Sequence, residues 1–134
     1  MTPFGEKLRA LRREKGVTLK QMAGALELSP AYLSALEHGH RGRPTPALVV
    51  QICEYFHLIW DDYEEMHRLA RLSHPRVVVD TSGLSPEATE LANLMAERID
   101  GLAPPAIKAM RDMLLGARPA AQPRGNRPRR RGVA

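Results

Sequence analysis

The chain of 134 residues has a single cysteine and few aromatic residues. One thiol cannot form an intramolecular disulfide, and without a CxxC pair it cannot build a cysteine-based zinc site, which fits a reducing cytoplasm. Phe, Trp and Tyr make up only 4% of the residues, too few for the stacking platforms that bind single-stranded nucleic acid. No apolar run approaches the roughly 20 residues of a membrane span, and charge begins at Glu6, before any signal-length apolar stretch. We therefore expect a soluble, cytoplasmic protein with no membrane partner.

Charge is unevenly distributed along the chain. The formal net charge is +5, but it is +3 over residues 1–60, −4 over residues 61–117 and +6 over residues 118–134. The basic segments at the two ends are the candidates for contact with a polyanion. Segment 118–134 contains six arginines and only one large apolar side chain, Val133, so it is predicted to be disordered. It either follows a polyanion by counterion release or only solubilises the chain.

Helical periodicity and helix start signals divide the N-terminal part into five short helices. The predicted helices are residues 3–15, a short helix capped by Thr18, residues 30–37 capped by Ser29, a helix opening at Pro46, and a helix whose first turn holds Asp61, Asp62, Glu64 and Glu65. The side chains predicted to face the core are Phe4, Leu8, Leu11, Leu19, Met22, Ala23, Leu26, Leu33, Leu36, Leu48, Val49, Ile52, Cys53, Phe56, Tyr63, Met66, Leu69 and Ala70. Cys53 is thus interpreted as a core thiol.

The pattern changes after His74-Pro75. Residues 76–80 contain three consecutive valines and predict a short strand or an extended segment. Ser85-Pro86 starts another helix, and a last helix is expected from Ala106 to about Leu115. Residues 76–116 are either a dimerisation module or two helices that cover the N-terminal domain.

The second and third helices have the spacing of a helix-turn-helix, with a tight turn around Glu27-Leu28. Such a unit can place an α-helix in the major groove of DNA, although any helical bundle contains similar pairs. A more specific pattern is formed by Phe4-Gly5, Leu8, Arg9, Leu11, Arg12, Thr18, Ala23, Leu28-Ser29, Leu33-Ser34, Leu36-Glu37, Gly39 and Pro44. On these residues, segment 4–58 resembles the Xre/Cro, lambda-repressor-like DNA-binding domain of bacterial and phage regulators.

The resemblance implies an interface with double-stranded DNA. The residues it places there are Arg9, Thr18, Lys20, Ser29, Ala31, Tyr32, Ser34, His38, His40, Arg41 and Arg43. Ser29 would cap its helix or bond a phosphate, and Ala31 would touch a thymine methyl group. Tyr32 would contact a base or a phosphate, and Arg41 and Arg43 would reach a phosphate or a narrow minor groove.

The sequence departs from the family pattern in three ways. The recognition helix is small and apolar at several positions, which leaves few side chains that could bond a base edge in two places. Leu19 stands where the family usually has a glutamine that braces the recognition helix. Glu27 stands where glycine is common, so the turn must hold a non-glycine residue in a left-handed conformation or follow another path. We also expect Glu37 to pair with Arg9 or Arg12 and to hold the first helix against the third.

The predicted fold class is all-α. It comprises a five-helix lambda-repressor-like domain over residues 1–73, a C-terminal dimerisation or interaction module over residues 74–117, and a disordered Arg-rich tail over residues 118–134. No catalytic residue, metal site or cofactor is predicted, so an enzyme is not expected. The resemblance implies a homodimeric, sequence-specific transcriptional repressor on an inverted-repeat operator at the bacterial nucleoid. The alternative is an antitoxin-like or adaptor protein that binds a protein partner through residues 76–116, with autoregulatory DNA binding.

Overall fold

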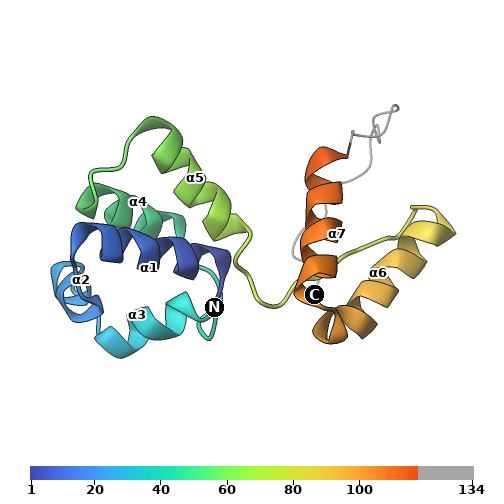
Figure 1. Cartoon of the computed structure of the whole chain (residues 1–134), viewed down its shortest axis with the longest axis horizontal. Coiled ribbons are helices and arrows are strands. Elements are labelled where there is room, and N and C mark those ends of the chain that lie inside the picture. Colours follow the sequence, from blue (N-terminus) through green and yellow to red (C-terminus); the bar gives the residue numbers. More distant parts are fainter. Residues whose placement is uncertain (118–134) are drawn as a thin grey trace. The chain divides into compact units, whose positions relative to one another are not determined.

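The computed structural model describes residues 1–117, and these residues form helices joined by loops (Figure 1). The helices are α1 (Pro3–Lys15), α2 (Leu19–Ala25), α3 (Pro30–Glu37), α4 (Pro46–Tyr55), α5 (Trp60–Arg71), α6 (Pro86–Arg98), the 3-10 turn η1 (Ile99–Gly101) and α7 (Pro104–Gly116). No strand occurs in this part of the chain, so the all-α prediction is confirmed. The predicted disorder of residues 118–134 lies outside the described residues.

The chain divides into two compact units between Val77 and Val78. In the first unit, α1 packs against α3 on one side and α5 on the other, α2 packs on α3, and α4 packs on α5 (Figure 1). The core is formed by the buried side chains Phe4, Leu8, Leu11, Met22, Ala23, Leu33, Leu36, Leu48, Val49, Ile52, Cys53, Phe56, Met66 and Ala70. The other predicted core residues Leu19, Leu26, Tyr63 and Leu69 are only partly buried, because they pack at the edge of this cluster.

Side-chain caps define the starts of the short helices. Thr18 accepts a hydrogen bond from the backbone N–H of Gln21 at 3.0 Å, and the Gln21 side chain accepts one from the N–H of Thr18 at 2.9 Å. This reciprocal pair is a capping box, which satisfies two donors that the first helical turn cannot. Ser29 caps α3 in the predicted way, since its hydroxyl accepts from the N–H of Tyr32 at 3.1 Å.

The segment after α5 is extended and carries no strand pairing. Val77, Val78 and Val79 are 72%, 70% and 64% exposed and form no strand in the described chain, where the extended alternative holds. A strand needs a neighbour to take up its backbone hydrogen bonds, and the described chain supplies none here.

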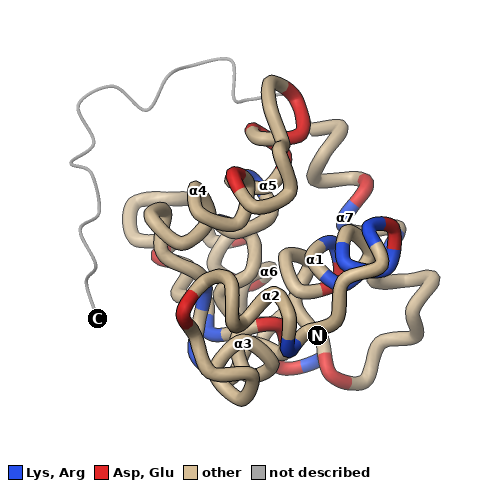
Figure 2. The backbone as a smooth tube through the Cα atoms, turned by 90° about the vertical axis from the view of Figure 1, so that its left-hand side faces the viewer, with Lys and Arg blue, Asp and Glu red and all other residues tan. Residues whose placement is uncertain are grey.

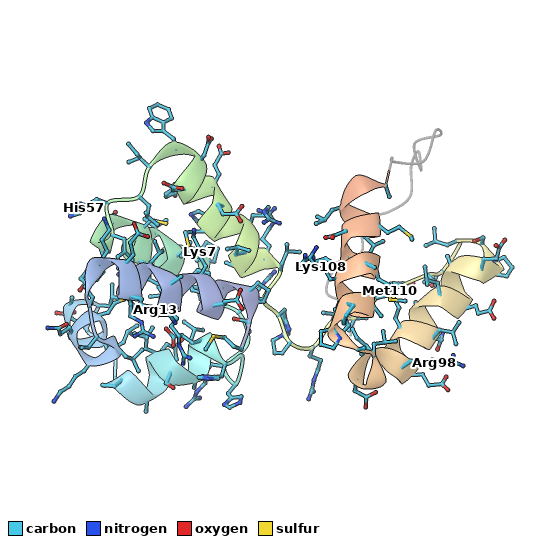
Figure 3. The ribbon with its side chains drawn as sticks, viewed as in Figure 1. Lys7, Arg13, His57, Arg98, Lys108 and Met110 are labelled. Atoms are coloured by element: carbon cyan, nitrogen blue, oxygen red, sulfur yellow. The ribbon has the colours of Figure 1, made fainter. Side chains whose placement is uncertain are left out.

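The second unit is a hairpin of α6 and α7 that buries none of its helical residues. Helix α7 begins at Pro104 rather than at the expected Ala106, because proline fits the first helical turn, where the backbone N–H has no helical partner. Met95, Ile99, Met110 and their apolar neighbours line a small cavity of about 170 Å³ between the helices. Figure 3 labels Met110 on α7. None of the described helices is both long enough and apolar enough to cross a membrane.

Candidate nucleic-acid interface

A tight left-handed turn joins α2 to α3. Glu27 has φ of 57°, and the backbone N–H of Leu28 donates to the carbonyl of Ala23 at 2.9 Å, so the end of α2 is closed by a Schellman-type bond. Of the two paths considered for this turn, the chain takes the left-handed one. The turn therefore keeps the helix-turn-helix geometry at the cost of backbone strain in a non-glycine residue.

Helix α3 turns one face to the core and another to solvent. Leu33 is fully buried and Leu36 is 1% exposed. Ala31 is exposed, and Tyr32 and Ser34 are half-buried, on the remaining surface of the helix. Three of the predicted groove-facing residues thus lie on accessible parts of a short, rigidly capped helix.

The C-terminal end of α3 is fastened to the start of α1. The N–H of Thr2 donates to the carbonyl of Glu37 at 3.0 Å, and the Thr2 hydroxyl donates to the same oxygen at 3.2 Å. A Cβ atom on Gly5 would collide with this carbonyl, so only glycine allows the two backbones to approach so closely. Of the two partners considered for the Glu37 carboxylate, the structure selects Arg12, while Arg9 stays exposed.

An open depression of about 520 Å³ lies on the surface where α1, α2 and α3 meet. It is lined by Arg9, Arg12, Arg13, Val17, Leu19, Ser34 and Glu37. Arg9 and Ser34 were predicted as DNA contacts, and the structure brings them to the same depression. Arg13 was not among the predicted DNA contacts, but it lines the depression beside them. Figure 3 labels it on α1, and its helical spacing from Arg9 is the signal that could have found it. The basic positions of α1 appear blue in Figure 2.

The apolar Leu19 side chain lines the wall of this depression where the family has a glutamine. Within α2, the nearest amide side chain, Gln21, is already engaged in the capping box with Thr18. The glutamine brace is therefore missing from this position. Thr18 and Lys20 are both exposed at the start of α2.

The loop after α3 carries the remaining predicted contacts. The guanidinium carbon of Arg41 lies 5.9 Å from the ring centroid of Tyr32, within the range of a cation–π interaction. The rings of His38 and His40 are 6.1 Å apart, and both side chains are exposed. Arg43 is also exposed, but it lies beside a cavity near α5 rather than beside Tyr32.

Cys53 serves the fold. Burial raises the pKa of the Cys53 thiol, which keeps it protonated in the core. The described residues hold no group of three His, Cys, Asp or Glu side chains placed to bind a metal ion.

A family model described as a helix-turn-helix domain matches residues 3–69, which is half of the chain. The chain belongs to this helix-turn-helix family. The matched segment contains all five helices of the first unit up to Leu69 and every predicted DNA contact.

Three curated relatives match part of this helix-turn-helix protein. It is 44% identical over 54 residues to the HTH-type transcriptional repressor RghR of Bacillus subtilis, with 40% of each chain covered. It is 42% identical over 52 residues to the uncharacterized HTH-type transcriptional regulator RghRB of the same organism, covering 39% of this chain and 37% of the relative. It is 54% identical over 43 residues to the HTH-type transcriptional regulator DdrOP3 of Deinococcus deserti, covering 32% and 31%.

These matches span at most about two fifths of each relative's length. No solved structure matches the chain significantly. The family description and the names of the relatives point to DNA-binding regulation and not to catalysis.

Proposed function

We propose that the chain is a sequence-specific transcriptional repressor that binds double-stranded DNA as a homodimer in the bacterial cytoplasm. The observation that carries this proposal is the capped helix α3, with Leu33 and Leu36 in the core and Ala31, Tyr32 and Ser34 on accessible surface. A helix held in this way fits the major groove, where the edges of the base pairs differ. Repression rather than activation is supported by the name of one relative, which is a transcriptional repressor.

In this proposal the start of α2 and the exposed basic residues of α1 hold the DNA backbone. Thr18 and Lys20 lie at the start of α2, where a phosphate would approach, and Arg9 and Arg13 flank the depression beside Ser34. Backbone contacts of this kind position the helix, and base-edge contacts by Tyr32 and Ser34 provide the specificity.

The homodimer is proposed to form through the second unit. Helices α6 and α7 bury none of their residues, so this hairpin lacks a core of its own. Its helices carry exposed apolar side chains: Leu91, Leu94, Ile107, Met110, Met113, Leu114 and Leu115. One helix-turn-helix contacts only a few base pairs, so two copies on half-sites about one helical turn apart would supply the specificity.

Selection of bound duplexes from a random pool, with the full chain at near-physiological salt, tests this function. We expect an inverted repeat whose half-sites lie about 10 base pairs apart, centre to centre. The double variant Tyr32→Ala/Ser34→Ala serves as the matched control and should yield no motif. Recovery of no motif by the unaltered chain would contradict sequence-specific binding.

The second candidate function is an antitoxin-like or adaptor protein that binds a different protein through residues 76–116. The same exposed apolar side chains of α6 and α7 favour this candidate. The mass of the purified protein in solution separates the two. A dimer supports the first proposal, and a monomer that acquires a defined heterologous partner supports the second.

A further inference from the structure

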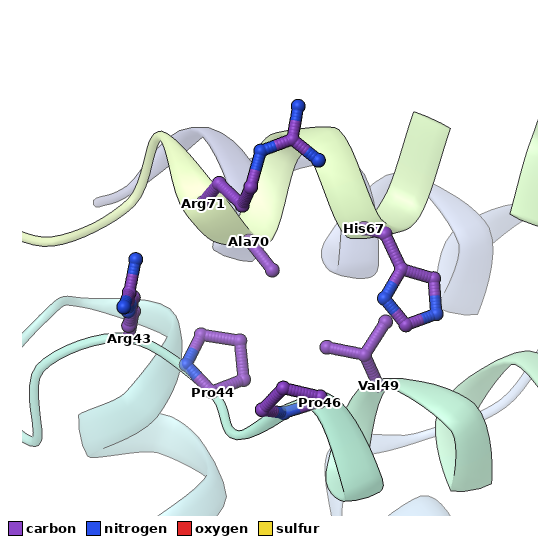
Figure 4. Close-up of a pocket in the computed structure, with 7 residues that line it drawn as sticks. All are labelled: Arg43, Pro44, Pro46, Val49, His67, Ala70 and Arg71. Carbon is purple, nitrogen blue, oxygen red and sulfur yellow. The ribbon is translucent and has the colours of Figure 1, made fainter. Parts of the chain in front are cut away.

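A cavity of about 290 Å³ lies in the first unit between α5 and the loop that leads into α4 (Figure 4). Four of the residues around it are apolar: Pro44, Pro46, Val49 and Ala70. The other three carry nitrogen donors: Arg43 from the loop, and His67 and Arg71 from α5. An apolar wall with a few polar groups is the usual composition of a small-molecule site, and the volume is near the lower end for such sites. In Figure 4 His67 points toward Val49, whereas the exposed Arg71 side chain points away from the apolar residues, so its guanidinium would turn inward on binding.

The polar groups at this cavity have no counter-charge of their own. No carboxylate lines the cavity, and within residues 1–117 neither Arg43 nor Arg71 forms a salt bridge. Nε2 of His67 is buried and has no hydrogen-bond partner among the described residues. The His67 ring packs against Tyr63 at a tilt of 51°, with centroids 4.5 Å apart, so it is held at one end of the cavity. Buried polar atoms are normally hydrogen-bonded, and an exception calls for an explanation.

We propose that this cavity binds a small organic monoanion, a carboxylate on an aromatic or branched aliphatic body. The carboxylate would be held by Arg71 and Arg43, because guanidinium groups bind carboxylates through paired hydrogen bonds. The apolar body would lie against Val49, Pro46 and Ala70. A volume of about 290 Å³ holds roughly ten water-sized groups, which suits an acid the size of benzoate.

The site also provides a regulatory link, and this part of the inference rests on the proposed function. Arg43 lines the cavity and is at the same time one of the proposed DNA contacts. A guanidinium paired with a bound carboxylate is no longer available to a phosphate. The ligand therefore weakens DNA binding, and by linkage DNA weakens binding of the ligand by the same factor.

The binding step is tested on the full chain without DNA, by NMR titration of the ¹⁵N-labelled protein at constant ionic strength. Benzoate and 3-methylbutanoate are the probes. Benzamide, which has no charge, and acetate, which has no apolar body, are the controls. We expect at least one probe to cause saturable shifts centred on the amides of Val49, His67, Ala70 and Arg71, and neither control to do so. No saturable shift with either probe, or an equal response to benzamide, overturns the proposal.

A pair of variants locates the site. Arg71→Gln should lower the affinity for the probe about tenfold, which is the effect of losing one charge-assisted hydrogen bond. Arg76→Gln removes an exposed arginine that does not line the cavity, and it should leave the affinity unchanged. Both residues lie outside the core, so both variants should keep the spectrum of a folded protein. Equal weakening by the two substitutions overturns the assignment.

The regulatory step is tested separately on a duplex recovered from the random pool. At saturating probe, DNA affinity should fall about fivefold or more, and Arg43→Gln should abolish this change. Unchanged affinity overturns the regulatory link while leaving the binding result intact. If the chain binds no DNA at all, the proposed function fails, and the DNA-free titration still decides whether the cavity is a site.

Discussion

Nη2 of Arg12 donates to both carboxylate oxygens of Glu37, at 3.1 Å to Oε1 and 2.9 Å to Oε2. The Glu37 side chain is 1% exposed and that of Arg12 is 12% exposed. The pair therefore joins α1 to the last residue of α3 across a largely dry contact. Because α3 is the proposed recognition helix, this ion pair helps to hold that helix in its orientation against α1.

Substitution of Arg12 by methionine should destabilise the fold by about 3 kcal/mol, because it leaves the Glu37 carboxylate buried without its partner. Urea unfolding followed by circular dichroism measures the change. The matched control is Arg68→Met, which breaks the exposed pair of Arg68 with Glu65 and should have little effect. The double variant Arg12→Met/Glu37→Leu should recover part of the loss. Similar effects of Arg12→Met and Arg68→Met would contradict this account.

Gly5→Ala should destabilise the protein by about 1–3 kcal/mol, since its Cβ would be forced against the carbonyl of Glu37. Gly24→Ala is the matched control on α2, where a Cβ would meet nothing within 4 Å. It should instead stabilise by roughly 0.5–1 kcal/mol through the better helix propensity of alanine. Thermal unfolding of the two variants compares them. If both variants changed the stability in the same direction, the backbone of α1 at Gly5 would not be packed tightly against Glu37.

Glu27→Gly should raise the free energy of unfolding by about 0.5–1 kcal/mol. The residue has φ of 57°, and glycine adopts this conformation without the steric cost of a side chain, which exceeds its extra chain entropy. The reverse test is Gly16→Ala, at φ of 67° with open space around it, which should lose about 1 kcal/mol. Denaturant midpoints of the two variants give the comparison. Destabilisation by Glu27→Gly would mean that its side chain makes a contact that outweighs the strain.

Tyr32→Ala and Ser34→Ala should each lower the preference for the selected duplex over random DNA, by about tenfold per lost base contact. Arg43→Ala should instead weaken binding to all duplexes and reduce the salt dependence, because a phosphate contact carries no sequence information. Lys108→Ala, on α7 in the second unit, is the charge-matched control and should change neither quantity. Fluorescence anisotropy at several salt concentrations measures both. Unchanged specificity in both α3 variants would exclude the proposed surface.

Cys53 should resist thiol reagents in the folded protein and react on unfolding. Its side chain is 1% exposed, and burial raises the pKa of the thiol. Because the unfolded thiol ionises near its ordinary pKa of about 8.5 while the native thiol stays protonated, the unfolded state loses protons first. The free energy of unfolding should therefore fall as the pH rises above that value. Colorimetric thiol titration with and without denaturant checks the reactivity, and rapid labelling of the native protein would contradict a core position.

Much of the first unit could be predicted from local patterns. Helix start signals at Thr18, Ser29 and Pro46 act within a few residues, and each one marks the start of a helix in the structure. The capping box that links Thr18 to Gln21 has an equally local signature, threonine followed three residues later by glutamine, and it was overlooked. Residues 76–80 are extended rather than a strand in the described chain, because strand formation depends on a neighbouring segment, which local propensity does not contain.

The helix starts, the caps at Thr18 and Ser29 and the apolar face of each helix could be predicted from the sequence, because they depend on spacing and on backbone sterics over a few residues. At Glu27 the sequence left two turn paths open, and the structure shows the left-handed one. The packing of the helices shows that Arg12 rather than Arg9 meets Glu37, that Arg13 and Arg9 both lie beside Ser34, and that Arg43 shares a cavity with Arg71. Those relationships join residues of different helices and loops. They depend on how the helices pack in three dimensions. The periodicity within one helix does not say which residues of another element lie near it.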